Sequence, residues 1–301
     1  MHYPNLVHRD WRGGVHASDA LVMNFYMQHP HGRLATAAIR ALELFRERIR
    51  PHALTRLNIG EGQDEPLDDA TWTRIRKRTL EPEPNQSAFI EMVDDYRRFA
   101  GFCANYRGLG TIPVPWPFRK DDVSVLYFRM PTGFLVERGP KYIHALALEL
   151  AAALPFNSGY ADFVLCSSRH ELEKALSLIC PRYPGMHVAW DHGNIHHINT
   201  WVDGVHWMNF LGQPVLGKLG GLAGLREHLD LPGISLHEMS GERVLITLGD
   251  APETGDLEAG HSLPLHRALA RILEPHLFLS KSMLGKPGPE ALTRWERRFL
   301  D

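Results

Sequence analysis

The segment 191–197, with the sequence Asp-His-Gly-Asn-Ile-His-His, concentrates potential metal ligands. Imidazole and carboxylate groups bind zinc, and the bound zinc activates water. Asp191, His192 and His196 could therefore serve a metal-dependent hydrolase. Two histidines four residues apart meet on one face of a helix, but the Gly-Asn pair between these two favours a turn. Neither a His-Glu-x-x-His motif nor a cysteine pair completes a ligand set. We therefore expect a structural or surface segment that holds no metal, and we expect no cofactor.

Motifs for nucleophilic catalysis and for phosphate binding are incomplete. Ser158 lies in Asn-Ser-Gly, without the preceding glycine that a nucleophile elbow requires. Cys103 and Cys166 occur in apolar strand patterns, where a buried thiol behaves as a small hydrophobic group. No G-x-x-x-x-G-K-[ST] loop is present. These observations favour a protein that is not an enzyme.

Carboxylates are concentrated in two segments that read as loops. The first is 60–69, which contains no base, and the second is 250–258; the residues 241–261 around the second hold five acids against one arginine, a local charge of −4. Loops on a rigid scaffold commonly carry recognition, although a run of charge is more often a solvated surface. The candidate contact residues are Glu61, Asp64, Glu65, Asp250, Glu253, Asp256 and Glu258.

A basic run, Arg74–Arg78, follows the first acidic loop and forms part of an expected helix. Asp68 is suited to cap the start of that helix, and bases near a helix end suit its dipole. This arrangement is typical of a solvated helix. The alternative is a scaffold or nucleic-acid-linked protein that uses these arginines.

Length and composition indicate one globular protein. The chain has 301 residues, 44% hydrophobic and 23% charged, and no linker divides it, so we expect a single domain over 1–301. A net charge of −2 argues against a general nucleic-acid binder.

The three cysteines cannot all pair, which favours a reducing cytosol. No signal peptide and no apolar run of about 18 residues is visible, so we expect a cytoplasmic protein without a membrane span.

The apolar periodicity predicts strands alternating with helices. Strands are expected at 20–27, 88–93, 102–106, 123–128, 161–166, 186–190, 205–211, 234–238 and 243–248. Helices are expected at 33–48, 142–154, 169–180, 214–229 (interrupted by glycines) and 263–273, followed by a basic amphipathic piece in the tail, 285–301. This order predicts an α/β or α+β fold, with a mixed β-sheet and helices packed on it. Two similar strand-helix halves meeting near residues 155–185 are one possible arrangement.

Alternation along the strand 205–211 makes a further prediction. Side chains two residues apart share a face of a strand, so Trp207 and Leu211 should lie on one face and Phe210 on the other. Large apolar residues on both faces predict that this strand is covered on both sides.

Four motifs give the chain a family resemblance. They are the Gly-Val-His-Trp-Met-Asn-Phe-Leu-Gly motif with its following Lys-Leu-Gly-Gly (204–221), Leu-Pro-Phe-Asn-Ser-Gly (154–159), the strand 244–248 followed by Gly-Asp-Ala-Pro, and Leu-Pro-Leu-His (263–266). In this order they are similar to the type VI immunity family, a bacterial group formerly classed as a domain of unknown function. The resemblance covers about residues 15–280. These are packing and turn residues, so they identify a fold better than an activity.

The resemblance implies a cytosolic protein encoded beside a toxin of the type VI secretion system. Such a protein would bind the cognate effector toxin in a stoichiometric complex and neutralise it, without enzyme activity, cofactor or direct contact with nucleic acid. Toxins found beside such proteins include nucleases, whose substrate an acidic loop can imitate. The segment 191–197 is not part of the family pattern.

Overall fold

The computed structural model describes residues 6–9, 15–98, 100–111, 121–167, 179–188, 196–279 and 290–301. Its strands are β1 (Val7–Arg9), β2 (Val15–Met27), β3 (Arg56–Asn58), β4 (Glu65–Pro66), β5 (Ala88–Val93), β6 (Cys103–Gly108), β7 (Ser124–Pro131), β8 (Ser158–Ser167), β9 (His187–Val188), β10 (Met208–Leu211), β11 (Ile234–Met239) and β12 (Arg243–Leu248). Its helices are α1 (His31–Arg48), α2 (Asp69–Leu80), α3 (Thr132–Arg138), α4 (Pro140–Ala152), α6 (Val215–Lys218), α7 (Gly221–His228), α8 (Pro264–Leu273) and α9 (Glu290–Glu296), with a short 3₁₀ turn, η3 (Glu274–His276).

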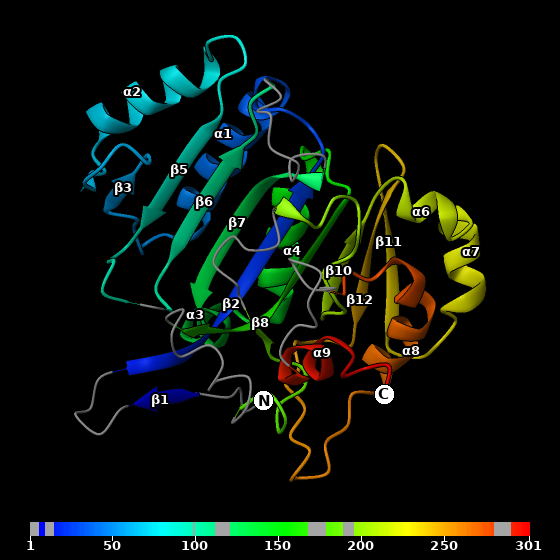
Figure 1. The fold of residues 1–301 in the computed structure, drawn as a ribbon. Helices are drawn as coiled ribbons and strands as arrows, with labels where there is room; N and C mark the ends of the chain where they lie inside the picture. Colours follow the sequence, from blue (N-terminus) through cyan, green and yellow to red (C-terminus); the bar gives the residue numbers. More distant parts are fainter. Residues whose placement is uncertain are drawn as a thin grey trace.

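One sheet connects all twelve strands of the described residues (Figure 1). Its order is β11-β12-β10-β8-β2-β7-β6-β5-β3-β4, with β1 attached to β2 and β9 to β8. Strand β9 runs parallel to β8, and the other strand pairs are antiparallel, so the sheet is mixed. The α+β fold with a mixed sheet is therefore confirmed.

Each half of the chain forms one lateral half of this sheet, and the two halves lie edge to edge. Strands β2 to β7 lie on one side and β8 to β12 on the other, and the halves meet where β2 pairs with β8 from Ala17↔Ser167 to Tyr26↔Ser158. Outward from this seam the strand orders are β2-β7-β6-β5 and β8-β10-β12-β11. The two halves are therefore connected differently, although both are built from strands and helices.

Helices cover the two faces of the sheet at different places. Helices α1 and α4 pack on the face that carries Phe210, in a core shared with α2 and α3. Helices α6, α7 and α8 pack on the opposite face, against Leu211, Val244 and Ile246 (Figure 1). Adjacent residues of a strand point to opposite faces, so Phe210 and Leu211 each belong to a different core. The expectation that this strand is covered on both sides is confirmed.

Local signals located most elements correctly. Strand β5 has the expected bounds, and the glycines at 217–221 divide the expected helix 214–229 into α6 and α7. The Asp68 side chain accepts a hydrogen bond of 2.7 Å from the backbone N–H of Thr71 and caps α2, as predicted. The hairpin β11–β12 turns through Gly241 and Glu242, both with positive φ (75° and 53°), a conformation that glycine adopts without strain.

One expected strand is shorter than its pattern. Strand β10 begins at Met208, so the alternation of side chains does not reach Trp207. The Trp207 ring lies in the same core as Phe210, whereas Leu211 belongs to the opposite core. The prediction that Trp207 and Leu211 share a face was therefore wrong.

Other expectations fall partly outside the described residues. This holds for most of the helix at 169–180 and for the end of the strand at 186–190. Helix α3 and strands β1, β3 and β4 were not predicted. The three cysteines are buried and free of disulfides. Among the helices of the described residues, none has the length and apolar character that a membrane span requires.

Candidate functional site

The second acidic loop, residues 250–262, is held in shape by an arginine from a distant segment. Arg182 donates from Nε and Nη2 to the two carboxylate oxygens of Asp256, at 2.8 and 2.6 Å, and its Nη1 lies 2.5 Å from Glu258. This hydrogen bonding lowers the pKa of Asp256. The backbone N–H of Leu257 also donates to the Arg182 carbonyl, at 3.0 Å. Two of the four candidate acids in this loop therefore have their charge matched within the chain.

The other two acids of this loop keep their charge unmatched. Asp250 and Glu253 are exposed, and no ion pair joins either one to another described residue. The loop backbone between them and Asp256 is anchored, because Gly185 N–H donates to the Thr254 carbonyl at 2.7 Å. Asp250 and Glu253 therefore present negative charge from a fixed backbone.

The first acidic loop pairs with the basic helix that follows it. Glu61 lies 2.5 Å from Arg78 and Glu65 lies 2.5 Å from Arg74, while Asp64 pairs with Arg56 on β3. The hydrogen bond from Arg78 lowers the pKa of Glu61. The two charge runs seen in the sequence thus largely neutralise each other, which is the solvated-surface arrangement of α2.

The two acidic loops lie in different parts of the fold (Figure 1). The first adjoins β3 and β4 at one edge of the sheet, whereas the second bonds to Arg182 and Gly185, which precede β9 beside the central strand β8. With strands about 4.8 Å apart, β8 and β3 are separated by roughly 24 Å across the sheet. The seven candidate acids therefore do not form one cluster.

The histidine segment is described only in part. Asp191 and His192 lie outside the described residues. His196 is half-exposed, and its Nδ1 lies 3.2 Å from Oδ1 of the buried Asp122, which precedes β7. In the part of the chain that the structure describes, no three His, Cys, Asp or Glu side chains are grouped to hold a metal ion. The metal-dependent hydrolase hypothesis finds no support there.

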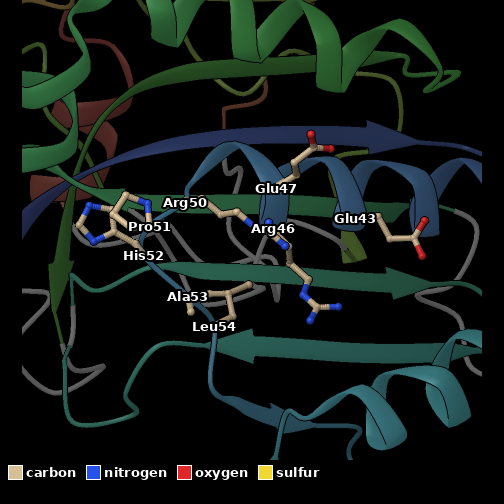
Figure 2. A pocket seen from close by; sticks show the side chains of 8 residues that line it. All are labelled: Glu43, Arg46, Glu47, Arg50, Pro51, His52, Ala53 and Leu54. Carbon is tan, nitrogen blue, oxygen red and sulfur yellow. The ribbon is translucent and has the colours of Figure 1, made fainter.

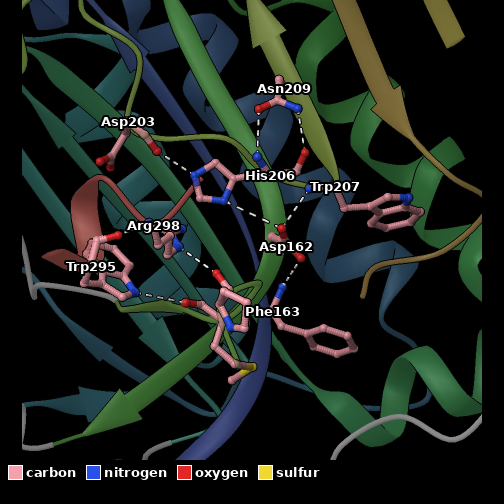
Figure 3. Close-up of polar contacts among 10 residues, drawn as sticks. Asp162, Phe163, Asp203, His206, Trp207, Asn209, Trp295 and Arg298 are labelled. Carbon is pink, nitrogen blue, oxygen red and sulfur yellow. Dashed lines mark hydrogen bonds and ion pairs between the residues drawn. The ribbon is translucent and has the colours of Figure 1, made fainter. Parts of the chain in front are cut away.

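A buried polar network beside β8 was not predicted as a unit (Figure 3). Its centre is Asp162, which is fully buried. The two oxygens of its carboxylate accept hydrogen bonds of 2.7 Å from the backbone N–H groups of Phe163 and Trp207, and Nδ1 of His206 is 3.7 Å away. Hydrogen bonds from two N–H groups stabilise this carboxylate inside the protein.

The loop before β10 supplies the next part of this network. Asn209 accepts from His206 N–H at 2.9 Å and donates back to the His206 carbonyl at 2.6 Å. The Asp203 carbonyl lies 2.5 Å from Nε2 of His206, and its carboxylate accepts from the Tyr26 hydroxyl at 2.5 Å. Asp203, His206 and Asn209 lie in or beside the 204–221 motif. Their partner Asp162 is more than forty residues earlier, and no local signal points to it.

Arg298, in the C-terminal segment, brings a partly buried cation to the network. It donates to the carbonyls of Pro184 at 2.6 Å and Trp295 at 3.0 Å, and its guanidinium lies 4.1 Å from the Trp295 ring centre (Figure 3). Burial lowers its pKa to about 10, so it remains charged at neutral pH. Burial also lowers the pKa of His266 to about 4, and that of His187. Arg298 therefore bonds the C-terminal segment to the residues that lead into β9, and burial keeps these two imidazoles neutral at pH 7.

A surface pocket of about 800 Å³ lies where α1 ends (Figure 2). It is lined by Glu43, Arg46, Glu47, Arg50, Pro51, His52, Ala53 and Leu54. Two of these side chains are already engaged, because Glu43 lies 2.9 Å from Arg76 and Arg46 lies 4.8 Å from the Trp72 ring centre. The lining contains alternating charges and no activated nucleophile, so this depression has the character of a salt-bridged surface.

Comparison with known proteins identifies a family and a related solved structure. The family TsiV, described as "Type VI immunity for VRR-NUC", matches residues 37–299. A search of curated proteins gives no match. The chain resembles a solved structure titled "Pseudomonas aeruginosa T6SS protein PA0821", with a TM-score of 0.75 and 21% identity over 95% of this chain and 82% of that chain. At this identity the likeness shows a common fold.

Proposed function

Because the chain belongs to the TsiV family of type VI immunity proteins, we propose that it neutralises a nuclease toxin of the VRR-NUC class by binding it. The observation that carries this proposal is the family match over residues 37–299. Neutralisation takes place in the cytoplasm, through a stoichiometric complex and without a reaction catalysed by this chain.

The geometry of the described residues supports action through a surface. The polar network around Asp162 is buried, and its groups are mostly bonded to one another. Helices cover both faces of the sheet and form a rigid scaffold with it. Such a scaffold is suited to presenting loops to a partner. A partner therefore meets loops and helix surfaces whose backbone is already ordered, which lowers the entropic cost of binding.

The acidic loops fit the surface that a nuclease must have. A nuclease binds the phosphates of its substrate with lysine and arginine, so its substrate groove is basic. We expect Asp250 and Glu253, which form no ion pair with another described residue, to face that groove, with Asp256 and Glu258 shaping the same loop. Glu61, Asp64 and Glu65 are weaker candidates, because arginines of the same chain already pair with them.

A titration of toxin activity tests this proposal. Increasing amounts of the protein are added to a fixed amount of the VRR-NUC toxin encoded by the neighbouring gene, and DNA cleavage is measured. Cleavage should fall linearly and reach its minimum at a fixed molar ratio. A trace of this protein that inactivated a large excess of toxin would show catalysis, and a lack of any inhibition would refute the toxin assignment.

A further inference from the structure

Trp201 has an exposed ring on a fixed backbone. Trp201 is 44% exposed, although tryptophan residues are usually well covered. Its N–H donates to the Ile198 carbonyl at 2.8 Å, and its carbonyl accepts from the Ser158 hydroxyl at 2.8 Å. Ser158 is the first residue of β8, so Trp201 is held at one end of the central strands.

Two carboxylates lie beside this tryptophan without a strong cation. Asn199 donates to the Asp121 backbone carbonyl at 3.0 Å and to its carboxylate at 2.8 Å, which places residues 196–201 against residues 121–122. The Asp122 side chain is only 7% exposed, its Oδ1 accepts no hydrogen bond, and its ion-pair partner is His196. No lysine or arginine of the described residues pairs with either aspartate. Asp121 is partly exposed, so an incoming positive group can reach its carboxylate, and the buried charge of Asp122 beside it adds to the local negative potential.

We infer that residues 121–122 and 196–201, here called the Trp201 surface, anchor the toxin through its basic, DNA-contacting face. This inference rests on the proposed function and assigns the residues that hold the complex together. An arginine or lysine of the toxin pairs with Asp121, and the Trp201 ring packs against its side chain or the surrounding apolar groups. Tryptophan is the residue type most often found at the centre of binding energy in interfaces, and its ring also attracts cations.

The other exposed aromatic side chain in the described residues has different surroundings. Tyr96 is 42% exposed, but the carboxylates next to it in the chain are already paired with arginines. Asp95 lies 3.6 Å from Arg97, and Asp94 lies 3.0 Å from Arg98. Tyr96 therefore matches Trp201 in exposure and lacks the unmatched negative charge, which makes it a control.

The Trp201 surface and the loop 250–262 lie toward opposite ends of β8. Trp201 contacts the first residue of β8, whereas Gly185, which bonds to the loop, leads into β9, and β9 pairs with Val164 and Leu165 near the far end of β8. Variants at the two surfaces should therefore change different rate constants of binding. Charge on an exposed loop mainly raises the association rate, whereas a packed anchor mainly slows dissociation.

Binding to a nuclease-inactive form of the VRR-NUC toxin tests the inference. The variants are Trp201→Ala, Trp201→Arg, Asp121→Asn and the control Tyr96→Ala, each checked for its cooperative thermal transition. We expect Trp201→Ala to raise Kd by about 30-fold or more, chiefly by faster dissociation. Trp201→Arg should weaken binding further by repelling the toxin's cations. Asp121→Asn keeps an acceptor for Asn199, so it should weaken binding and reduce its salt dependence without unfolding the loop. Tyr96→Ala should stay within about threefold of the wild type.

Each outcome has one meaning. A wild-type protein that does not bind the toxin refutes the proposed function itself. If the wild type binds and a folded Trp201→Ala or Trp201→Arg variant binds within about threefold of it, the Trp201 surface is not the anchor. An equal loss in Tyr96→Ala also overturns the inference, because exposure alone would then explain the effect. Unchanged affinity and salt dependence in Asp121→Asn removes Asp121 from the interface.

Discussion

Arg182 donates to both carboxylate oxygens of Asp256, a residue 74 positions later in the chain, at 2.8 and 2.6 Å. A planar guanidinium that meets a carboxylate in this two-bond geometry fixes orientation as well as distance. Asp256 Oδ1 in turn accepts from the N–H groups of Glu258 at 3.2 Å and Ala259 at 3.3 Å. The shape of the acidic loop therefore depends on a segment outside it.

Replacing Arg182 with alanine should loosen the loop and leave the fold intact. The amides of Ala259 and His261 depend on Asp256 for their hydrogen bonds, so their hydrogen exchange should become faster. The pair is partly exposed and screened by solvent, so the cooperative unfolding temperature should change little. Arg97→Ala, which removes an exposed pair with Asp95, is the control. Unchanged exchange in the Arg182 variant would mean that the loop holds its shape without this pair.

Reversing the unmatched charges of the same loop should slow association with the toxin. Asp250→Lys combined with Glu253→Lys changes only exposed acids, whereas a change at Asp256 would also remove its pair with Arg182. The association rate should fall at low salt and depend less on salt concentration, because electrostatic steering is screened by ions. Stopped-flow or surface-based kinetics measures both quantities.

The control for this prediction carries the same change of charge at a distant position. Glu81 and Glu83 are exposed acids that follow α2, on the side of the sheet that ends in β3 and β4 (Figure 1). Glu81→Lys combined with Glu83→Lys should slow association less than the loop variant does. Equal slowing would indicate that net charge alone matters, and a wild-type rate in the loop variant would exclude this loop from recognition.

Truncating Phe210 should destabilise the whole protein. Phe210 is fully buried, and its ring centre lies 5.0 Å from that of Phe25 and 5.6 Å from that of Phe156. Phe210→Ala removes these contacts and leaves a cavity, at a cost of about 3–5 kcal/mol in the free energy of unfolding. Denaturant unfolding measures the change, with Val136→Ala, at a residue 66% exposed, as the control. A loss below about 1 kcal/mol would place Phe210 outside a well-packed core.

Stability should fall on acidification through the buried histidines. Burial lowers the pKa of His266 from its ordinary 6.5 to about 4, an effect that His206 and Arg298 reinforce and Asp162 opposes. Between these values the unfolded chain takes up a proton that the folded chain does not, so stability is lost as pH falls from 6.5 toward 4. For His266 alone this loss amounts to about 3 kcal/mol. The burial of His187 acts in the same direction.

A variant without this imidazole separates titration from packing. His266→Phe should lose less stability than the wild type between pH 8 and pH 5, whatever its stability at pH 8. The comparison within each protein removes the packing change, which is the same at both pH values. Parallel stability curves for the two proteins would show that His266 does not contribute to the acid sensitivity.

Short-range signals in the sequence determined most of the secondary structure. The spacing of Leu34, Ala38 and Phe45 buries one face of α1, and Asp68 caps α2 through a hydrogen bond to a residue three positions later. The turn of the β11–β12 hairpin likewise follows from residues that are neighbours in the chain. Such features depend on contacts within one or two turns, so a single sequence contains the information for them. The family motifs are similarly readable, because each is a continuous stretch.

Tertiary structure alone decided which charges meet and which remain unmatched. The acids of both loops look alike in sequence, yet Arg78 neutralises Glu61 and Arg182 neutralises Asp256, while Asp250 and Glu253 have no such partner in the described residues. The same holds for the Asp162 network, whose members come from segments far apart in the chain, and for the face that Trp207 occupies. These contacts depend on the order of strands in the sheet, and that order is set by the packing of distant apolar faces rather than by local sequence.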